Sequence, residues 1–285
     1  MQTLEQLADE LNDSNTTEIV LLSEAAKLEK QNTSAKMSSG FADIDGCIDG
    51  GFREGDFTVI TGIPGEGKTT FARMLTLNFA TQGIPSLWFS HEMTSRELWD
   101  SFEKMGAQDD LISFVPLALE DDLAWMLKHC DIAIGQHGVK AIFLDTLGDV
   151  VKSVKRQQEL SNYATYLAQI CKDLRSYAIK NNVMIFTVAH AVKNTRSRSN
   201  ETDNSDIANS NGIPAAATNI FHIWRHTGAA DYDHPENLSY VKVGKSRRNG
   251  AAKGHTYKFL FDNNRLVPMG KEPRLANPSD ITKEW

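Results

Sequence analysis

The stretch DFTVITGIPGEGKTTFARML (56–75) decides the fold. Its first six residues, 56–61, have the apolar and β-branched side chains typical of a buried strand. Residues 62–69, GIPGEGKT, match the pattern G-x-x-x-x-G-K-[ST] without a mismatch, and a helical pattern follows from Lys68 to Gln82. A strand, a glycine-rich turn and a helix in this order predict a phosphate-binding P-loop in an α/β domain.

In such a loop, successive backbone N–H groups face the phosphates, and the helix N-terminus adds partial positive charge. We expect Lys68 to reach the β- and γ-phosphates of ATP, and the Thr69 hydroxyl to bind Mg²⁺. Asp145 ends the apolar run AIFLD (141–145), where a second group that holds Mg²⁺ would belong. The expected nucleotide-binding residues of the loop are Gly62, Ile63, Pro64, Gly65, Glu66, Gly67, Lys68, Thr69 and Thr70.

Apolar runs alternate with amphipathic runs along the rest of the core. Near-continuous apolar runs, typical of strands buried on both faces, lie at 85–90, 140–145 and 183–189. Helices are predicted near 94–105, 120–137 and 157–181. After residue 219 the pattern changes to consecutive strands, at 219–224, 238–243, 256–261 and 265–269. This order predicts an α/β fold: a mostly parallel sheet with helices on both faces and an antiparallel C-terminal extension.

The composition is that of an ordinary soluble globular protein. The chain has 285 residues, of which 41% are hydrophobic and 24% charged, which excludes a collagen-like or wholly disordered chain. No apolar run approaches the length needed to cross a bilayer, so no membrane partner is expected. Its three cysteines lie far apart and form neither a disulfide framework nor a zinc ribbon, which favours a reducing cytoplasm. His222 and His226 lie on a predicted strand and its exit rather than on a helix, so their spacing does not converge on a metal.

The net charge of −7 is concentrated at the N-terminal end, because the first 26 residues carry six acidic and no basic side chains. Apolar residues there have helical spacing: Leu4, Leu7, Ala8 and Leu11, then Ile19, Leu22, Ala26 and Leu28. We predict a helical arm and linker over 1–37, a core domain over 38–268 and a loose tail over 269–285. The arm could dock on its own core or on a neighbouring subunit.

Several segments besides the P-loop are distinctive. They are SGFADIDGCIDGGFREGDFTVITG (39–62), FSHEM (89–93), VMIFTVAH (183–190), DIANSNGIPAAATNIFHIWR (206–225) and KSRRNG (245–250). In this order they resemble the RecA-like hexameric helicase family that includes DnaB, Twinkle and the phage primase-helicases, from about Ser38 to Pro268. The resemblance implies a RecA-like P-loop core, preceded by the arm, that assembles into a homo-oligomeric ring, expected to be hexameric.

The resemblance also implies roles for five residues. Glu92 would be the general base that orients water against the γ-phosphate, and His190 would sense that phosphate. Arg225 would lie near the adenine. Arg247 would be an arginine finger delivered to the next subunit, with Lys245 as its partner. Ala208 and Ala215 depart from the family, which has an arginine and a glutamine there to link the nucleotide state to the DNA-facing loops.

Basic side chains cluster in predicted loops that follow strand ends. The candidate DNA-binding residues are Lys152, Lys155 and Arg156 in the first loop, and Lys193, Arg196 and Arg198 in the second. The charge of −7 argues against coating of nucleic acid by bulk attraction, whereas residues 193–253 carry a net +3. The resemblance implies that both loops line a channel and hold single-stranded DNA by its phosphates.

The function expected from the sequence is therefore an ATP- and Mg²⁺-dependent DNA helicase that translocates on single-stranded DNA as a ring. A separate primase or polymerase is an expected partner, and the cytoplasm of a bacterium or of a phage host is the expected location. Two alternatives remain open. One is a RecA/RadA/KaiC-like ATPase that switches assembly or remodels recombination intermediates, and the other is a non-catalytic ATP-binding protein.

Overall fold

The computed structural model describes residues 21–23, 36–120, 122–150, 163–192, 200–207, 212–226 and 237–271. The chain divides into two units, residues 1–35 and residues 36–285. In the first unit only Leu21–Ser23 are described, and residues 22 and 23 are helical. The predicted arm thus lies almost wholly outside the described residues. No helix in the described ranges is long and apolar enough to cross a membrane.

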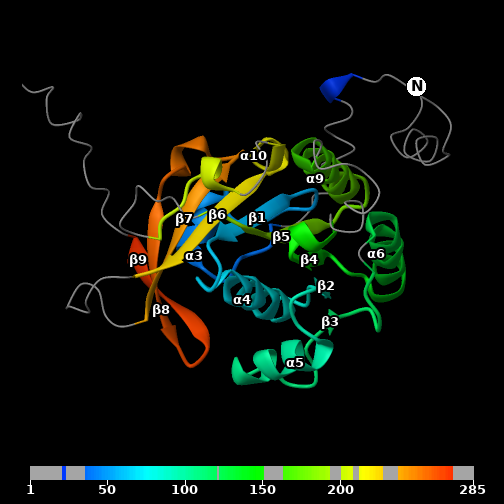
Figure 1. Ribbon diagram of the computed structural model, residues 1–285, viewed down its shortest axis with the longest axis horizontal. Helices are drawn as coiled ribbons and strands as arrows, with labels where there is room; N and C mark the ends of the chain where they lie inside the picture. Colours follow the sequence, from blue (N-terminus) through cyan, green and yellow to red (C-terminus); the bar gives the residue numbers. More distant parts are fainter. Residues whose placement is uncertain are drawn as a thin grey trace, which may run out of the picture. The chain divides into compact units, whose positions relative to one another are not determined.

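The second unit is built on a nine-stranded sheet in the order β3-β2-β4-β5-β1-β6-β7-β8-β9 (Figure 1). The first six strands are β1 (Phe57–Gly62), β2 (Ser86–Ser90), β3 (Ser113–Phe114), β4 (Ala141–Asp145), β5 (Met184–His190) and β6 (Asn219–Arg225). They pair in parallel. The antiparallel extension is β7 (Leu238–Ser246), β8 (Thr256–Asp262) and β9 (Arg265–Lys271). The predicted sheet architecture is confirmed.

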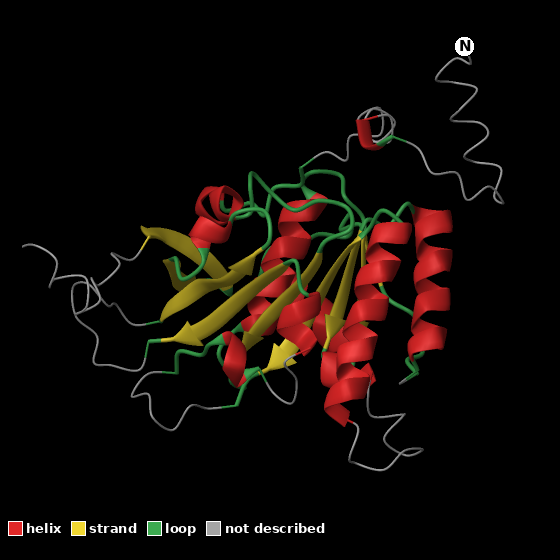
Figure 2. Ribbon diagram, turned by 90° about the horizontal axis from the view of Figure 1, so that it is seen from above, coloured by secondary structure: helices red, strands yellow, loops and turns green. Residues whose placement is uncertain are grey.

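Helices cover both faces of this sheet (Figure 2). The helices of one face are α3 (Ala42–Cys47), α4 (Lys68–Ala80) and α5 (Ser95–Lys104), which pack in one apolar core. A second core holds α6 (Leu123–His137), α9 (Tyr163–Lys180) and α10 (Gly212–Ala216). The short helix α7 (Leu147–Val150) follows β4. Because both faces are covered, β1, β2 and β4 are buried along their whole length, as their apolar runs predict.

Local signals explain where the helices begin and end. Thr94 caps α5, and its backbone N–H bonds to Glu97 in a complete capping box. The Asp122 side chain caps α6, which ends at Gly138 with φ of 65°. The helix predicted at 157–181 begins at Tyr163 within the described residues.

Several short elements and one boundary differ from the sequence-based expectation. Strand β3 has only two residues and α10 only five, too few for a periodic pattern to show. The last strand, β9, continues to Lys271, so the tail expected over 269–285 begins inside the sheet. Pairing with Tyr257 on β8 holds Lys271 in place, and a local composition rich in proline and charge does not reveal such a partner.

The turn that carries Arg247 is anchored to the start of β1 by its neighbour, Arg248. Nη1 of Arg248 donates to both carboxylate oxygens of Asp56, at 2.7 and 2.9 Å, and the backbone N–H of Arg53 adds a third bond at 2.9 Å. Asp56 is completely buried, and this burial raises its pKa, whereas the Arg248 charge lowers it. The ion pair therefore compensates a buried carboxylate at the edge of the sheet.

Arg248→Ala is expected to lower the free energy of unfolding by about 3 kcal/mol at pH 8, because Asp56 is then left buried without a counter-charge. The pKa of Asp56, already raised, should rise further in this variant. A carboxyl group whose pKa is raised by folding costs stability as the pH increases through that pKa. The difference in the free energy of unfolding between Arg248→Ala and the unchanged protein should therefore be smaller at acidic pH. Urea denaturation at pH 5 and pH 8 measures this, with Arg248→Lys as the charge-retaining control. An equal deficit at both pH values would contradict the assignment.

Candidate active site

The P-loop lies at the carboxyl end of β1, where the backbone requires glycine. A Cβ atom on Gly62 would lie 2.2 Å from the Ile223 carbonyl oxygen, too close for any side chain. Gly67, with φ of 98°, begins α4 from the left-handed region. Lys68 is buried, and its Nζ donates to the Ile63 carbonyl within the loop at 2.9 Å. Burial lowers the pKa of Lys68, while the carboxylates of Glu92 and Asp145 oppose this change. The loop thus forms a compact cradle around a lysine.

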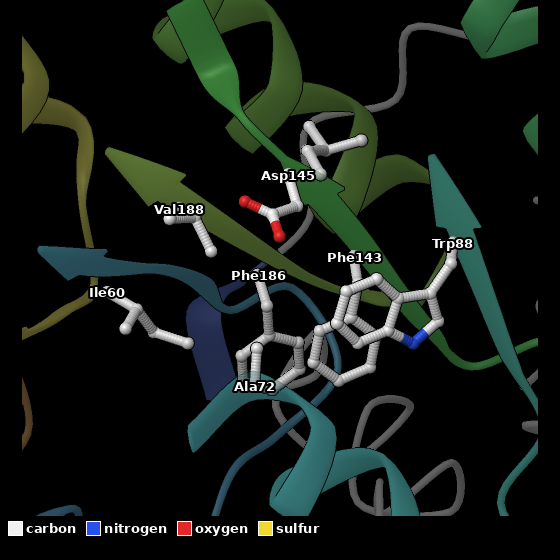
Figure 3. A pocket seen from close by; sticks show the side chains of 8 residues that line it. Ile60, Ala72, Trp88, Phe143, Asp145, Phe186 and Val188 are labelled. Atoms are coloured by element: carbon white, nitrogen blue, oxygen red, sulfur yellow. The ribbon is translucent and has the colours of Figure 1, made fainter. Parts of the chain in front are cut away.

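Asp145 lies beside the loop, at the end of β4. The Thr69 hydroxyl donates to its Oδ2 at 2.9 Å, whereas its Oδ1 has no hydrogen-bond partner in the described part of the chain. Figure 3 shows the carboxylate against an apolar wall. The labelled residues of that wall are Ile60, Ala72, Trp88, Phe143, Phe186 and Val188. The pKa of Asp145 is raised to about 6, chiefly by burial in this wall; the Thr69 hydrogen bond opposes this rise and the Glu92 charge adds to it. A buried carboxylate oxygen without a partner, next to a threonine hydroxyl, fits a hard cation such as Mg²⁺.

Glu92 and His190 meet at the same edge of the sheet. Strand β2 ends beside Asp145, and the backbone N–H of His91 donates to the Asp145 carbonyl at 2.7 Å, which places Glu92 just beyond the strand. His190 ends β5 and pairs in register with Gly62. The His190 Nε2 lies 3.2 Å from Glu92 Oε1. Both side chains are almost half exposed. The structure therefore brings Lys68, Thr69, Glu92, Asp145 and His190 together, as the sequence predicts.

Glu66 has a structural role that the sequence did not reveal. Its buried carboxylate accepts from the Asn200 side chain at 2.8 Å and from the backbone N–H of Arg225. The P-loop is thereby tied to the end of β6 and to the segment that begins at Asn200. The Arg225 guanidinium carbon lies over the Phe261 ring, 5.7 Å from its centre, in a cation–π contact. The sequence did not reveal this contact, because nothing in it brings β8 close to the end of β6.

Lys245 and Arg247 lie at the opposite end of the strands from the P-loop, near the beginning of β6. The backbone N–H of Arg247 donates to the Thr218 carbonyl at 3.0 Å, and the N–H of Thr218 donates to the Phe57 carbonyl at 2.7 Å. Phe57 begins β1, five residues before Gly62, which is a distance of about 16 Å along a parallel strand. Within one subunit, these two side chains do not join the cluster around Lys68.

The structure says nothing about the candidate DNA-binding side chains. Lys152, Lys155 and Arg156, together with Lys193, Arg196 and Arg198, lie outside the described residues. Ala208 also lies outside them, whereas Ala215 is in α10 and accepts a hydrogen bond from Arg247 through its carbonyl. His222 is buried, and its ring nitrogens lie 2.8 Å from Thr202 Oγ1 and 2.8 Å from Asn204 Oδ1. Burial lowers the pKa of His222 to about 3, so it is a neutral part of the core.

Residues 36–114 match the family model of the DnaB-like helicase C-terminal domain. The resemblance to the DnaB-like helicases is thereby confirmed. The matched residues include the P-loop and Glu92, and they end before Asp145. Together with the site described above, the match indicates an ATP-hydrolysing enzyme.

Solved structures share the fold. A DnaB-like replicative helicase, described with its interactions with primase, is 15% identical with a TM-score of 0.69 and covers 92% of this chain and 70% of its own. The ATPase domain of G40P is 16% identical with a TM-score of 0.70, over 88% and 99% of the two chains. A KaiC-like protein from Pyrococcus horikoshii OT3 is 18% identical with a TM-score of 0.63, over 82% and 99%. These similarities show a RecA-like fold.

A curated relative comes from a different functional class. The DNA repair and recombination protein RadB of Methanobrevibacter smithii is 24% identical over 234 residues, which cover 76% of this chain and 90% of the relative. This relative fits the recombination alternative as well as the family model fits a helicase, so the choice between them depends on the activity toward DNA.

The Mg²⁺-dependent part of ATP binding is expected to weaken about 10-fold for each pH unit below 6, because a proton on Asp145 competes with the cation. Titration of a fluorescent ATP analogue between pH 5 and 8, with Mg²⁺ and with EDTA, measures this effect. Asp145→Asn is the matched control, because it keeps the pH dependence of the nucleotide phosphates and removes that of the carboxyl group. The same Mg²⁺ enhancement at pH 5 and pH 8 would contradict the assignment of Asp145.

Proposed function

We propose that this protein is an ATP-driven translocase on single-stranded DNA that works as a ring-forming replicative helicase and hydrolyses ATP at subunit interfaces. The separation of Lys245 and Arg247 from the P-loop carries the proposal. The carboxyl ends of the parallel strands would bind and hydrolyse ATP. The opposite ends would present Lys245 and Arg247, which have no nucleotide within their own subunit to act on. Such a surface would be complementary to the P-loop end of a second copy, and head-to-tail repetition of this contact would form a closed ring where its rotation closes.

The residues around the P-loop would divide the chemistry among them. The P-loop backbone and Lys68 would bind the phosphates, while Thr69 and Asp145 would hold Mg²⁺, which neutralises the charge that develops during phosphoryl transfer. Glu92 would orient the attacking water and accept its proton. His190, in contact with Glu92, would report the presence of the γ-phosphate.

The neighbouring subunit would complete the site. Its Arg247 and Lys245 would stabilise the transferred phosphoryl group, so efficient hydrolysis would require the assembled ring. Arg225 and Phe261 would hold the adenine at the rim of the same site.

The basic loops would contact DNA. Lys152, Lys155 and Arg156, with Lys193, Arg196 and Arg198, would follow the phosphates of a single strand in a central channel. Such binding is salt-dependent and indifferent to sequence. A separate primase or polymerase would supply the other replication activities, in the cytoplasm of a bacterium or of a phage host.

A second candidate function is supported by the relative in the recombination class. RadB matches along most of its own length, and Ala208 and Ala215 stand where the helicase family has coupling side chains. Under this alternative, the nucleotide would switch assembly or remodel recombination intermediates without unwinding.

Steady-state ATP hydrolysis with and without single-stranded DNA separates the candidates, with native mass measured in the same buffer. The translocase should be stimulated at least about 5-fold by single-stranded DNA and should form a closed oligomer with ATP. An ATP hydrolysis rate that is the same with and without single-stranded DNA would favour the RadB-like function. An absence of turnover, equal to that of Lys68→Ala, would indicate an ATP-binding protein without catalysis.

A further inference from the structure

Three cationic side chains converge on the C-terminal end of α10. The Lys245 ammonium group donates to the Pro214 carbonyl, and Nε of Arg247 donates to the Ala217 carbonyl at 3.0 Å. Arg175, from α9, is the third cation. Figure 1 shows that α9 runs beside α10, and Nη1 of Arg175 donates to the Ala216 carbonyl at 3.2 Å. With the bond from Arg247 to the Ala215 carbonyl, four successive carbonyls of this helix end are bonded to a cation.

These cations are close enough to repel one another. Burial, together with the smaller effect of the Arg247 and Arg175 charges, lowers the pKa of Lys245 to about 8. Burial and the Arg175 charge likewise lower the pKa of Arg247. Helix α10 has no titratable side chain, and among the described residues the charged groups that act on Lys245 are Arg247 from its own turn and Arg175 from α9. In the described part of the chain, none of the three makes an ion pair with a carboxylate.

The partial negative charge of a helix C-terminus explains the presence of one cation there, but not of three. One cation at a helix C-terminus is a common stabilising feature, because it complements the partial negative charge of the last carbonyls. Three cations at a helix of five residues exceed that partial charge of about one-half. The excess positive charge is therefore suited to a polyanion from outside the subunit, such as a triphosphate.

We propose that Arg175 is a positioning residue of the inter-subunit site, holding Lys245 and Arg247 in place for the triphosphate bound to the neighbouring subunit. The inference rests on the proposed function, because it takes these two side chains to act on a neighbour's nucleotide. Arg175 acts through α10: it ties the helix to α9, and the helix carbonyls in turn fix the two other cations. The sequence gives no sign of this, because Arg175 belongs to no motif.

Loss of Arg175 should displace the side chains of Lys245 and Arg247 without changing the residues around the P-loop. For Arg175→Ala we expect kcat for ATP hydrolysis to fall roughly 10- to 100-fold, with the KM for ATP nearly unchanged. Arg175→Lys, which keeps the charge and one donor, should recover much of this loss. Lys172→Ala removes an exposed cation from the same helix and is the matched control, with an unchanged kcat.

Two readouts distinguish positioning from a general loss of stability. Lys245 should gain a higher pKa when Arg175 is removed, so the alkaline limb of the kcat profile should move to higher pH in Arg175→Ala. In addition, Arg175→Ala subunits mixed with Lys68→Ala subunits should hydrolyse ATP faster than either alone, because each supplies the part that the other lacks. An alkaline limb that stays in place would overturn the proposal.

The mixing experiment also distinguishes a failure of this inference from a failure of the proposed function. Arg247→Ala mixed with Lys68→Ala is the reference pair. If the Arg247→Ala mixture recovers activity and the Arg175→Ala mixture does not at any ratio, Arg175 is not part of the inter-subunit site. If neither mixture recovers, the inter-subunit site itself is wrong, and the proposed function fails together with the role of Arg175.

Discussion

Arg247→Ala is expected to lower kcat for ATP hydrolysis by about 10³- to 10⁵-fold, the effect of removing an arginine finger. Binding of ATP by the same subunit should be unchanged, because its own P-loop lies about 16 Å away along β1. Steady-state hydrolysis and binding of a fluorescent ATP analogue measure the two quantities on one preparation.

Arg248→Lys is the matched control for Arg247→Ala. Arg248 is the adjacent arginine, but its guanidinium bonds to Asp56 rather than to the α10 carbonyls that hold Arg247. A variant that keeps its charge should therefore retain near-normal kcat. A fall in kcat of less than about 10-fold for Arg247→Ala would contradict a finger role. A parallel loss of ATP binding by the isolated subunit would place Arg247 in its own site and would contradict the geometry described here.

Glu92→Gln is expected to lower kcat by about 10²- to 10⁴-fold, because an amide cannot accept the proton of the attacking water. Nucleotide affinity should be retained or improved, since the substitution removes a negative charge near the phosphates. Single-turnover hydrolysis of radiolabelled ATP, alongside equilibrium binding, measures the chemical step without product release.

The matched control for Glu92→Gln is Glu103→Gln, an exposed carboxylate on α5 without a place in the site. Its kcat should be that of the unchanged protein. Normal turnover in Glu92→Gln would contradict the general-base role, and would leave His190 and Glu92 as a structural pair at the strand ends.

The P-loop edge of the site was predictable because its residues lie at the ends of strands. Parallel strands end at one edge of a sheet, so Asp145 and His190, each closing an apolar run, had to lie near Gly62. Glu92, two residues beyond β2, required the motif order as well as the strand. The sheet with its antiparallel extension was predictable as well. The sequence shows where strands that alternate with helices give way to strands that follow one another directly.

Other parts of the site depend on contacts that a linear pattern does not contain. The bond between Glu66 and Asn200 joins two positions that are far apart and individually unremarkable. Arg175 is one of several basic residues in its part of the chain, and only the packing of α9 on α10 sets it apart. Short elements such as β3 were missed for a related reason, because two residues hold no period and exist only through pairing with β2.

The measurement that tests the central claim most directly is strand separation on a forked DNA duplex, with ATP hydrolysis and native mass measured on the same preparation. The account predicts that oligomeric protein with ATP and Mg²⁺ separates the strands, and that Lys68→Ala, Glu92→Gln and Arg247→Ala oligomers do not. An intact oligomer that hydrolyses ATP at the normal rate, in the presence of the fork, and separates no strands would contradict it.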